Sequence, residues 1–230
     1  MPPRALLSIA LFVLACTTAS HAPAPGTGTL FGTLQLVPHQ GAEPATTSSA
    51  GYDDPRLRHT RRLDYSRPGF AVVYVESTTT PPATAEFVIR DTPTGPALHP
   101  RQLAIGSGSV LRVRNESAEQ HIVSLPRAGL LERLAPGAGL ETPLLRGGAT
   151  PLFLLDSPEV EALLFVAPGR FDTVSGDGRW ELPDLPPGPA RLFAWHARFP
   201  RTELEVNVRE AERQELALEV GVDVEPTRAP

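Results

Sequence analysis

The sequence predicts an all-β protein. Pro occurs 26 times in 230 residues, and a residue that lacks a backbone N–H interrupts long helices and favours short strands joined by turns. Several segments alternate apolar and polar residues with a period of two, for example TELEVNV (202–208) and QELALEV (214–220), which is typical of half-buried strands. The sequence has no heptads, no exact internal repeat and no long amphipathic helix. The net charge of −5 gives no electrostatic reason to expect nucleic-acid binding.

Residues 1–22 have the features of a secretory signal segment. One basic residue precedes an apolar run from Ala5 to Ala15, and small residues follow. This run is too short to span a bilayer, and no later segment is apolar for long enough to do so. We therefore expect an exported protein, located in the periplasm or at the outer membrane.

Cys16 is the only cysteine, and it stands where the apolar run ends, in VLAC. This arrangement resembles a bacterial lipobox, in which the cysteine is acylated and anchors the mature protein to outer-membrane lipid. Cleavage after Ala19 or after Ala22 remains an alternative. In each case the folded part contains no thiol, so it has neither an internal disulfide nor a thiolate ligand.

The region 23–85 is expected to contribute two strands separated by a long polar loop. LFGTLQLV (30–37) reads as a strand, and FAVVYVE (70–76) is almost continuously apolar, which indicates burial on both faces. The loop 39–69 is longer than most connections. Its second half is either a contact patch for an acidic partner or lipid headgroups, or a solvated insertion, and it carries Tyr52, Arg56, Arg58, Arg61, Arg62 and Tyr65.

A Thr/Pro linker precedes a second region, 86–167. Its segment SVLRVRN (109–115) alternates apolar residues with Arg, as in a half-buried strand. Leu130, Leu131 and Leu134 have helical spacing, which predicts a short helix before Pro136. Further strands are expected at 86–90, 121–125, 150–156 and 161–167.

The last third, 168–222, consists of strands separated by turn residues. Gly176-Asp177-Gly178 predicts a hairpin turn between the strands on either side. We expect residues 223–230 to be a disordered tail.

Residues 86–167 resemble the cupredoxin (plastocyanin-like) domain of bacterial exported proteins related to methylamine utilisation. The resemblance covers the front half of the family pattern, at Pro100, Gly108, Asn115, Ser117 and His121. It implies a Greek-key β-sandwich, with a metal-ligand loop that would lie at LFLLDSPEVEA (152–162).

Residues 168–222 resemble the carboxypeptidase regulatory domain, a β-sandwich grouped with carbohydrate-binding-like folds. The matching text is TVSGDGRWELPDLPPGPARLFAWHAR (173–198). The strands at 30–37 and 70–76 look like members of this same sandwich. The resemblance implies an accessory domain.

A type-1 copper site needs two imidazoles, a thiolate and a weak axial thioether. The only Met is the initiator and the only Cys lies in the signal segment, so we expect no copper cofactor. We expect His121 to be a vestigial ligand, half exposed and hydrogen-bonded to a loop carbonyl. The alternative is a Zn or Cu(II) site completed by His99, His196, Glu159 or Glu161.

Trp180 and Trp195, with the adjacent His196, form a candidate ligand surface. Placed in neighbouring antiparallel strands, the two indoles could share a face and stack on sugars. Packing in the core is the alternative that we favour for both.

We found no catalytic motif, and the carboxylates are scattered along alternating strands. The sequence therefore predicts an exported, lipid-anchored, non-catalytic binding or structural module of the cell envelope. Its partner would be an envelope protein or a glycan. A metal-binding protein that uses His121 and a carbohydrate-binding module that uses Trp180 and Trp195 remain alternatives.

Overall fold

The structure, a computed structural model, describes residues 23–39, 64–76, 78–224 and 227–228. The signal segment with Cys16, and the loop positions Tyr52, Arg56, Arg58, Arg61 and Arg62, lie outside the described residues. Within the described residues, no helix is long and apolar enough to span a membrane.

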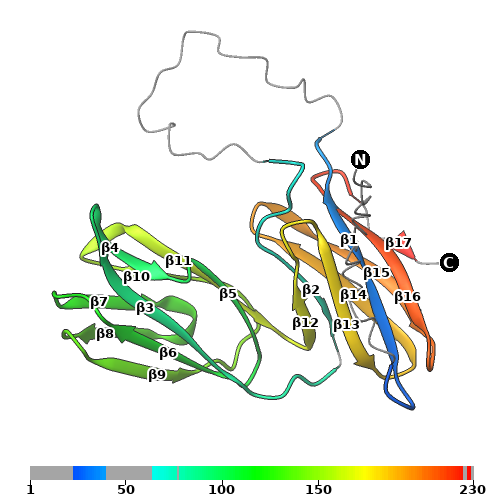
Figure 1. Ribbon diagram of the computed structural model, residues 1–230, viewed down its shortest axis with the longest axis horizontal. Helices are drawn as coiled ribbons and strands as arrows, with labels where there is room; N and C mark the ends of the chain where they lie inside the picture. The colour runs from blue at the N-terminus through cyan, green and yellow to red at the C-terminus, as the bar shows by residue number, and fades with distance from the viewer. Residues whose placement is uncertain (1–22, 40–63, 77, 225–226, 229–230) are drawn as a thin grey trace, which may run out of the picture.

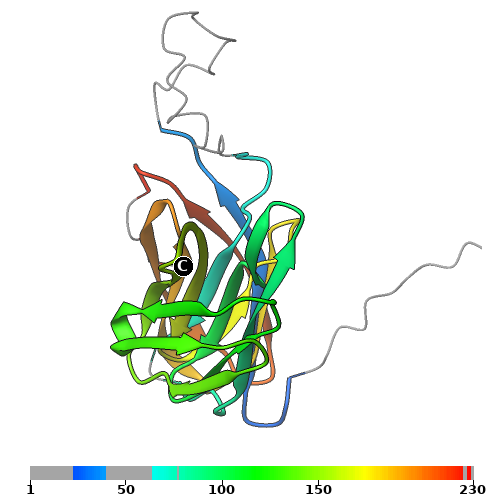
Figure 2. The same cartoon turned by 90° about the vertical axis from the view of Figure 1, so that its left-hand side faces the viewer.

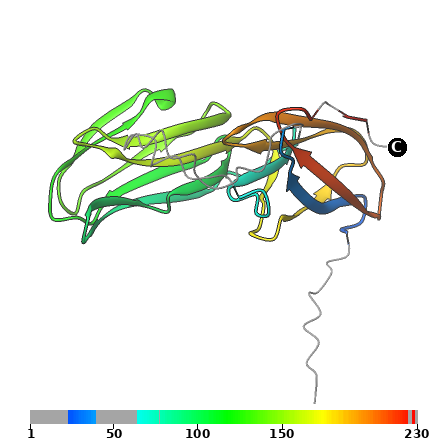
Figure 3. The same ribbon diagram turned by 90° about the horizontal axis from the view of Figure 1, so that it is seen from above.

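The all-β prediction is confirmed, because the described residues form strands and only one short 3-10 helix, η1 (Pro126–Ala128). The strands build two β-sandwiches placed end to end in an elongated molecule (Figure 1). The view from above shows the same two lobes (Figure 3).

The first sandwich is formed by consecutive strands. One sheet has the order β4-β3-β6-β9 and the other β5-β11-β10-β7-β8, and a core that includes Phe87, Leu111 and Leu164 fills the space between them. The strands are β3 (Thr84–Thr92), β4 (Gly95–His99), β5 (Gln102–Gly106), β6 (Val110–Asn115), β7 (His121–Leu125), β8 (Leu130–Leu134), β9 (Gly139–Pro143), β10 (Gly148–Leu154) and β11 (Ser157–Ala167).

Strand β6 illustrates how the sequence pattern builds this sandwich. Leu111 and Val113 are fully buried in the core, whereas Arg112 and Arg114 point outward because successive side chains alternate between the two faces. On the outer face Arg112 pairs with Glu141 of β9 through its Nε at 2.9 Å. The half-buried strand predicted for this segment is present.

The second sandwich combines the two N-terminal strands with the C-terminal third. Its sheets have the orders β13-β1-β16 and β12-β2-β14-β15-β17. Both N-terminal strands, β1 and β2, therefore belong to this sandwich, as the sequence indicated. The strands are β1 (Gly28–Leu36), β2 (Ala71–Val75), β12 (Arg170–Thr173), β13 (Arg179–Leu185), β14 (Gly188–His196), β15 (Phe199–Val208), β16 (Arg213–Val220) and β17 (Thr227–Arg228). The last of these lies in the segment for which we expected a disordered tail.

The two sandwiches meet at an aromatic seam. Tyr74 of β2 and Phe193 of β14 stack with ring centroids 5.1 Å apart, and Tyr74 also contacts Phe165 of β11 at 5.7 Å. Seen from the side of the first sandwich, the second lies directly behind it (Figure 2). The seam explains why β2 is apolar on both faces, since one face lines the second core and the other covers the first sandwich.

The predicted helix around Leu130–Leu134 is wrong. The 3-10 turn ends at Gly129, whose φ is 66°, and Leu130–Leu134 then pair with β7 as strand β8. Only Leu134 of this strand is buried. Hydrogen bonding to β7 therefore decides the conformation, and the helical spacing of the leucines does not.

The predicted hairpin at Gly176-Asp177-Gly178 is also wrong, although the turn is present. β12 pairs with β2 and β13 pairs with β1, so the chain crosses from one sheet to the other at this turn. Gly178 has a φ of +85°, and a Cβ there would lie 2.7 Å from the carbonyl oxygen of Leu34. The turn is therefore built for close packing against β1.

Candidate functional site

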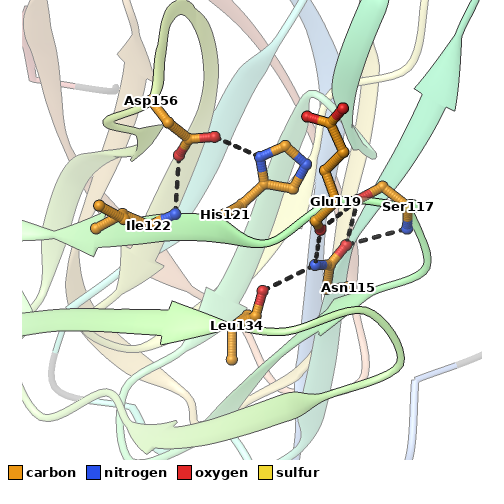
Figure 4. A network of polar contacts seen from close by, with 7 residues as sticks. All are labelled: Asn115, Ser117, Glu119, His121, Ile122, Leu134 and Asp156. Atoms are coloured by element: carbon orange, nitrogen blue, oxygen red, sulfur yellow. Dashed lines mark hydrogen bonds and ion pairs between the residues drawn. The ribbon is translucent and has the colours of Figure 1, made fainter.

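His121 is the first residue of β7, at one end of the first sandwich. Its register partner across the sheet is Leu134 of β8, and the residue is only 2% exposed. The segment that leads into it begins at Asn115, the last residue of β6. The site therefore lies where β6, β7 and β8 come together (Figure 4).

Asn115 organises the segment before His121. It is fully buried, and its side-chain Nδ2 donates to the carbonyl oxygens of Glu119 at 2.7 Å and Leu134 at 2.9 Å. Its Oδ1 accepts from the backbone N–H of Ser117 at 3.0 Å and from the Ser117 hydroxyl at 2.6 Å. This side-chain turn fixes the path of residues 115–119 and hence the start of β7.

The partner of His121 is Asp156, in the turn between β10 and β11. Nδ1 of His121 lies 2.6 Å from Oδ2 of Asp156, and Oδ1 of the same carboxylate accepts from the Ile122 backbone N–H at 2.8 Å. Burial acts to raise the pKa of Asp156, but these hydrogen bonds together outweigh it, so the pKa is lowered. An ionised carboxylate only accepts hydrogen bonds, so Nδ1 is the nitrogen that carries the proton.

This geometry corrects the expectation for His121. We expected a half-exposed ring bonded to a loop carbonyl, whereas its side chain is 3% exposed and bonded to a carboxylate. Its Nε2 is buried and has no hydrogen-bond partner among the residues that the structure describes. Asp156 was missed as a site residue, although it lies within the segment 152–162 where the resemblance placed the ligand loop.

The site does not fit a type-1 copper centre. A ligating imidazole nitrogen must be unprotonated; Nδ1 of His121 holds its proton against Asp156, which leaves only the buried Nε2 as a possible donor atom. Nowhere in the part of the chain that the structure describes do three His, Cys, Asp or Glu side chains gather as a metal would require. The proposed partners are also dispersed: His99, Glu159 and Glu161 are exposed, and His196 is buried in the second sandwich.

The structure does not give Trp180 and Trp195 a shared stacking face. Trp180 is 3% exposed in the core of the second sandwich, whereas Trp195 is half-buried in the seam, 4.5 Å from the ring of Phe165. The sequence suggested adjacent antiparallel strands for the two indoles, but β13 and β14 belong to different sheets. The combined sugar platform is therefore wrong for this fold.

His196 anchors the segment that leads into β2. Its Nδ1 accepts from the Arg198 backbone N–H at 3.2 Å, and its ring packs against Phe199 with centroids 5.1 Å apart. Burial lowers its pKa, as does the nearby charge of Arg198, while a hydrogen bond to the backbone of Pro68 opposes this. The residue thus has a structural environment in which the neutral ring is favoured.

The structure is similar to solved cupredoxins over 36 to 41% of the chain. A purple cupredoxin from Nitrosopumilus maritimus matches at 18% identity over 36% of this chain and 99% of its own, with a TM-score of 0.33. A mutant amicyanin in its reduced state matches at 15% identity over 36% of this chain and 82% of its own, with a TM-score of 0.30. Auracyanin from Roseiflexus castenholzii matches at 12% identity over 39% of this chain and 99% of its own, also with a TM-score of 0.30. No family model and no curated protein matches the sequence.

Proposed function

We propose that this protein is an exported, lipid-anchored, non-catalytic binding or structural module of the cell envelope. In this proposal its first sandwich is a degenerate cupredoxin scaffold, in which Asp156 holds Nδ1 of His121 and the other ring nitrogen is buried. The regulatory-domain-like second sandwich is packed against it through the aromatic seam.

The observation that carries the proposal is the double contact of Asp156. One carboxylate oxygen binds Nδ1 of His121 and the other binds the Ile122 N–H, so the β10–β11 turn is tied to β7. A bound metal would tie the same elements together through its ligands. The contact therefore supports a scaffold that keeps its shape without redox chemistry.

Isothermal titration with Cu(II) and with Zn(II) tests the non-metal part of the proposal. We expect the wild-type protein and His121→Ala to give the same heats, because the only free imidazole nitrogen at this site is buried. Saturable binding by the wild type that His121→Ala abolishes would establish the metal-binding alternative instead.

Mass spectrometry of the membrane-extracted protein tests the envelope anchor. The proposal requires an acylated Cys16 at the mature N-terminus. A mature protein that begins at Ser20 or Pro23 would refute lipid anchoring while leaving export intact.

A further inference from the structure

The outer face of the sheet β5-β11-β10-β7-β8 carries an apolar surface, part of which no described segment of the chain covers. Residues Val123, Leu152, Leu154 and Leu164 point into the first core, so their neighbours along each strand point outward. These outward side chains form rows across the sheet by register. One such row runs through Glu161, Phe153, Ser124 and Leu131.

This surface continues directly from the aromatic seam. The row formed by Ala149 and Phe165 is covered by the second sandwich. The next rows contain the half-buried Leu163, Pro151, Phe153 and Ile122, together with Leu131 at 61% and Leu155 at 49% exposure. β7 and β8 lie at the free side of the first sandwich, away from the second (Figure 1).

Two unpaired charges flank this apolar surface at opposite sides. Glu161 of β11 and Arg133 of β8 are both exposed, and neither forms an ion pair with any residue that the structure describes. Other arginines on exposed sheet faces are paired, for example Arg114 with Glu116 at 2.6 Å. The two side chains stand three strand spacings apart, or roughly 14 Å across the sheet.

We propose that this face binds a second copy of the same chain as a two-fold dimer. The surface, which we call the sheet face, consists of Ile122, Leu131, Pro151, Phe153, Leu155 and Leu163 with Arg133 and Glu161. A two-fold axis in the plane of the interface, midway between Arg133 and Glu161, sets each Arg133 against Glu161 of the other copy. It also lays the two apolar areas on one another, as in aligned sheet packing.

A second copy fits this surface for two reasons. The sheet face is continuous with the aromatic seam, where the same sheet already packs against a sheet of the second sandwich. The sheet of a second copy would therefore match its shape. The charges of the sheet face are self-complementary under two-fold rotation, and each dimer would contain the ion pair twice. The inference rests on the proposed function in naming a partner for the binding module, but it does not depend on how His121 behaves.

Charge reversal tests this arrangement with the purified full chain. Light scattering coupled to size exclusion, over a wide range of protein concentrations, should show a dimer for the wild type. Arg133→Glu and Glu161→Arg should each weaken dimerisation by roughly tenfold or more, because each places like charges together at two positions. The double variant R133E/E161R should restore it. Association through the apolar N-terminal segment would respond to none of these changes.

Glu132→Arg is the matched control. Glu132 lies on the same edge strand as Arg133 but points to the opposite face, and it has the same exposed character. We expect this variant to dimerise like the wild type. A monomeric wild type, single reversals without effect, or a double variant that fails to recover would each overturn the inference. None of these results would alter the metal titration, so failure here and failure of the metal-free proposal are distinguishable.

Discussion

Phe165 of β11 and Trp195 of β14 lie ring against ring across the junction of the two sandwiches, with their centroids 4.5 Å apart. Phe70 approaches the same indole edge-on at 6.0 Å. The guanidinium of Arg201 packs over the Phe193 ring of this seam, 4.3 Å from the ring centre. The two sandwiches therefore share a buried aromatic contact in addition to their connecting segments.

Replacing Phe165 by Ala should uncouple the two sandwiches. The side chain is 2% exposed, so its loss should cost about 3–5 kcal/mol of unfolding free energy. We expect a single denaturant transition in the wild type and two separate transitions in the variant, followed by far-UV circular dichroism, which reports the strands of both sandwiches. Leu145→Ala is the control, because Leu145 is 75% exposed and should have almost no effect. A single transition retained in Phe165→Ala would contradict a coupling role for the seam.

Replacing Asn115 by Ala should lower stability by about 3 kcal/mol, because several buried groups lose their hydrogen-bond partners together. The carbonyls of Glu119 and Leu134 would lose their donor. Asn115→Asp retains the acceptor for Ser117 but removes the Nδ2 donor, so it separates the two halves of the turn. Urea denaturation measures both variants. A loss of stability in Asn115→Ala no larger than that of an exposed substitution would remove the organising role assigned to this side chain.

Acidification should destabilise the docking of the segment 64–70 through His196. Its pKa in the folded protein is lowered from 6.5, mainly by burial. The neutral ring is favoured on folding, so this contribution is fully present above the unfolded pKa and is lost as the pH falls below it. Unfolding free energies between about pH 8 and pH 5 should therefore fall more steeply for the wild type than for His196→Gln. Equal slopes for the two proteins would exclude His196 as the source.

The sequence predicted the class of fold and much of its interior because alternation and turn residues are local signals. The apolar run at 70–76 indicated burial on both faces, and β2 is buried on both. Strand pairing depends on distant contacts, and this is where the predictions failed. The sequence around Gly178 is typical of a hairpin turn. The strands on either side are nevertheless in different sheets, because β12 pairs with β2 and β13 pairs with β1.

Of the candidate site, only the part formed by Asn115 and His121 could be predicted from the sequence. Asn115 and His121 stand close together in sequence and carry a recognisable pattern. Asp156 lies 35 positions from His121. A single carboxylate in a turn gives no sequence pattern from which its hydrogen-bond partner could be predicted. The same limitation applies to Trp180, whose burial depends on which sheet β13 joins.

Asp156 and His121 should also contribute jointly to stability. In a double-mutant cycle with His121→Ala and Asp156→Ala, we expect a coupling energy of about 1–3 kcal/mol, because each residue is the other's hydrogen-bond partner. Thermal or urea unfolding of the four proteins provides the measurement. Additive effects of the two substitutions would show that the observed contact carries no stabilisation.

The most direct test of the metal-free site is the nitrogen NMR spectrum of His121, recorded with and without Zn(II). We expect a protonated Nδ1, held by Asp156, and an unprotonated Nε2, with both resonances unchanged when Zn(II) is added because Nε2 is buried. A proton found on Nε2 instead, or ring-nitrogen signals that shift with Zn(II) in the wild type, would contradict this expectation.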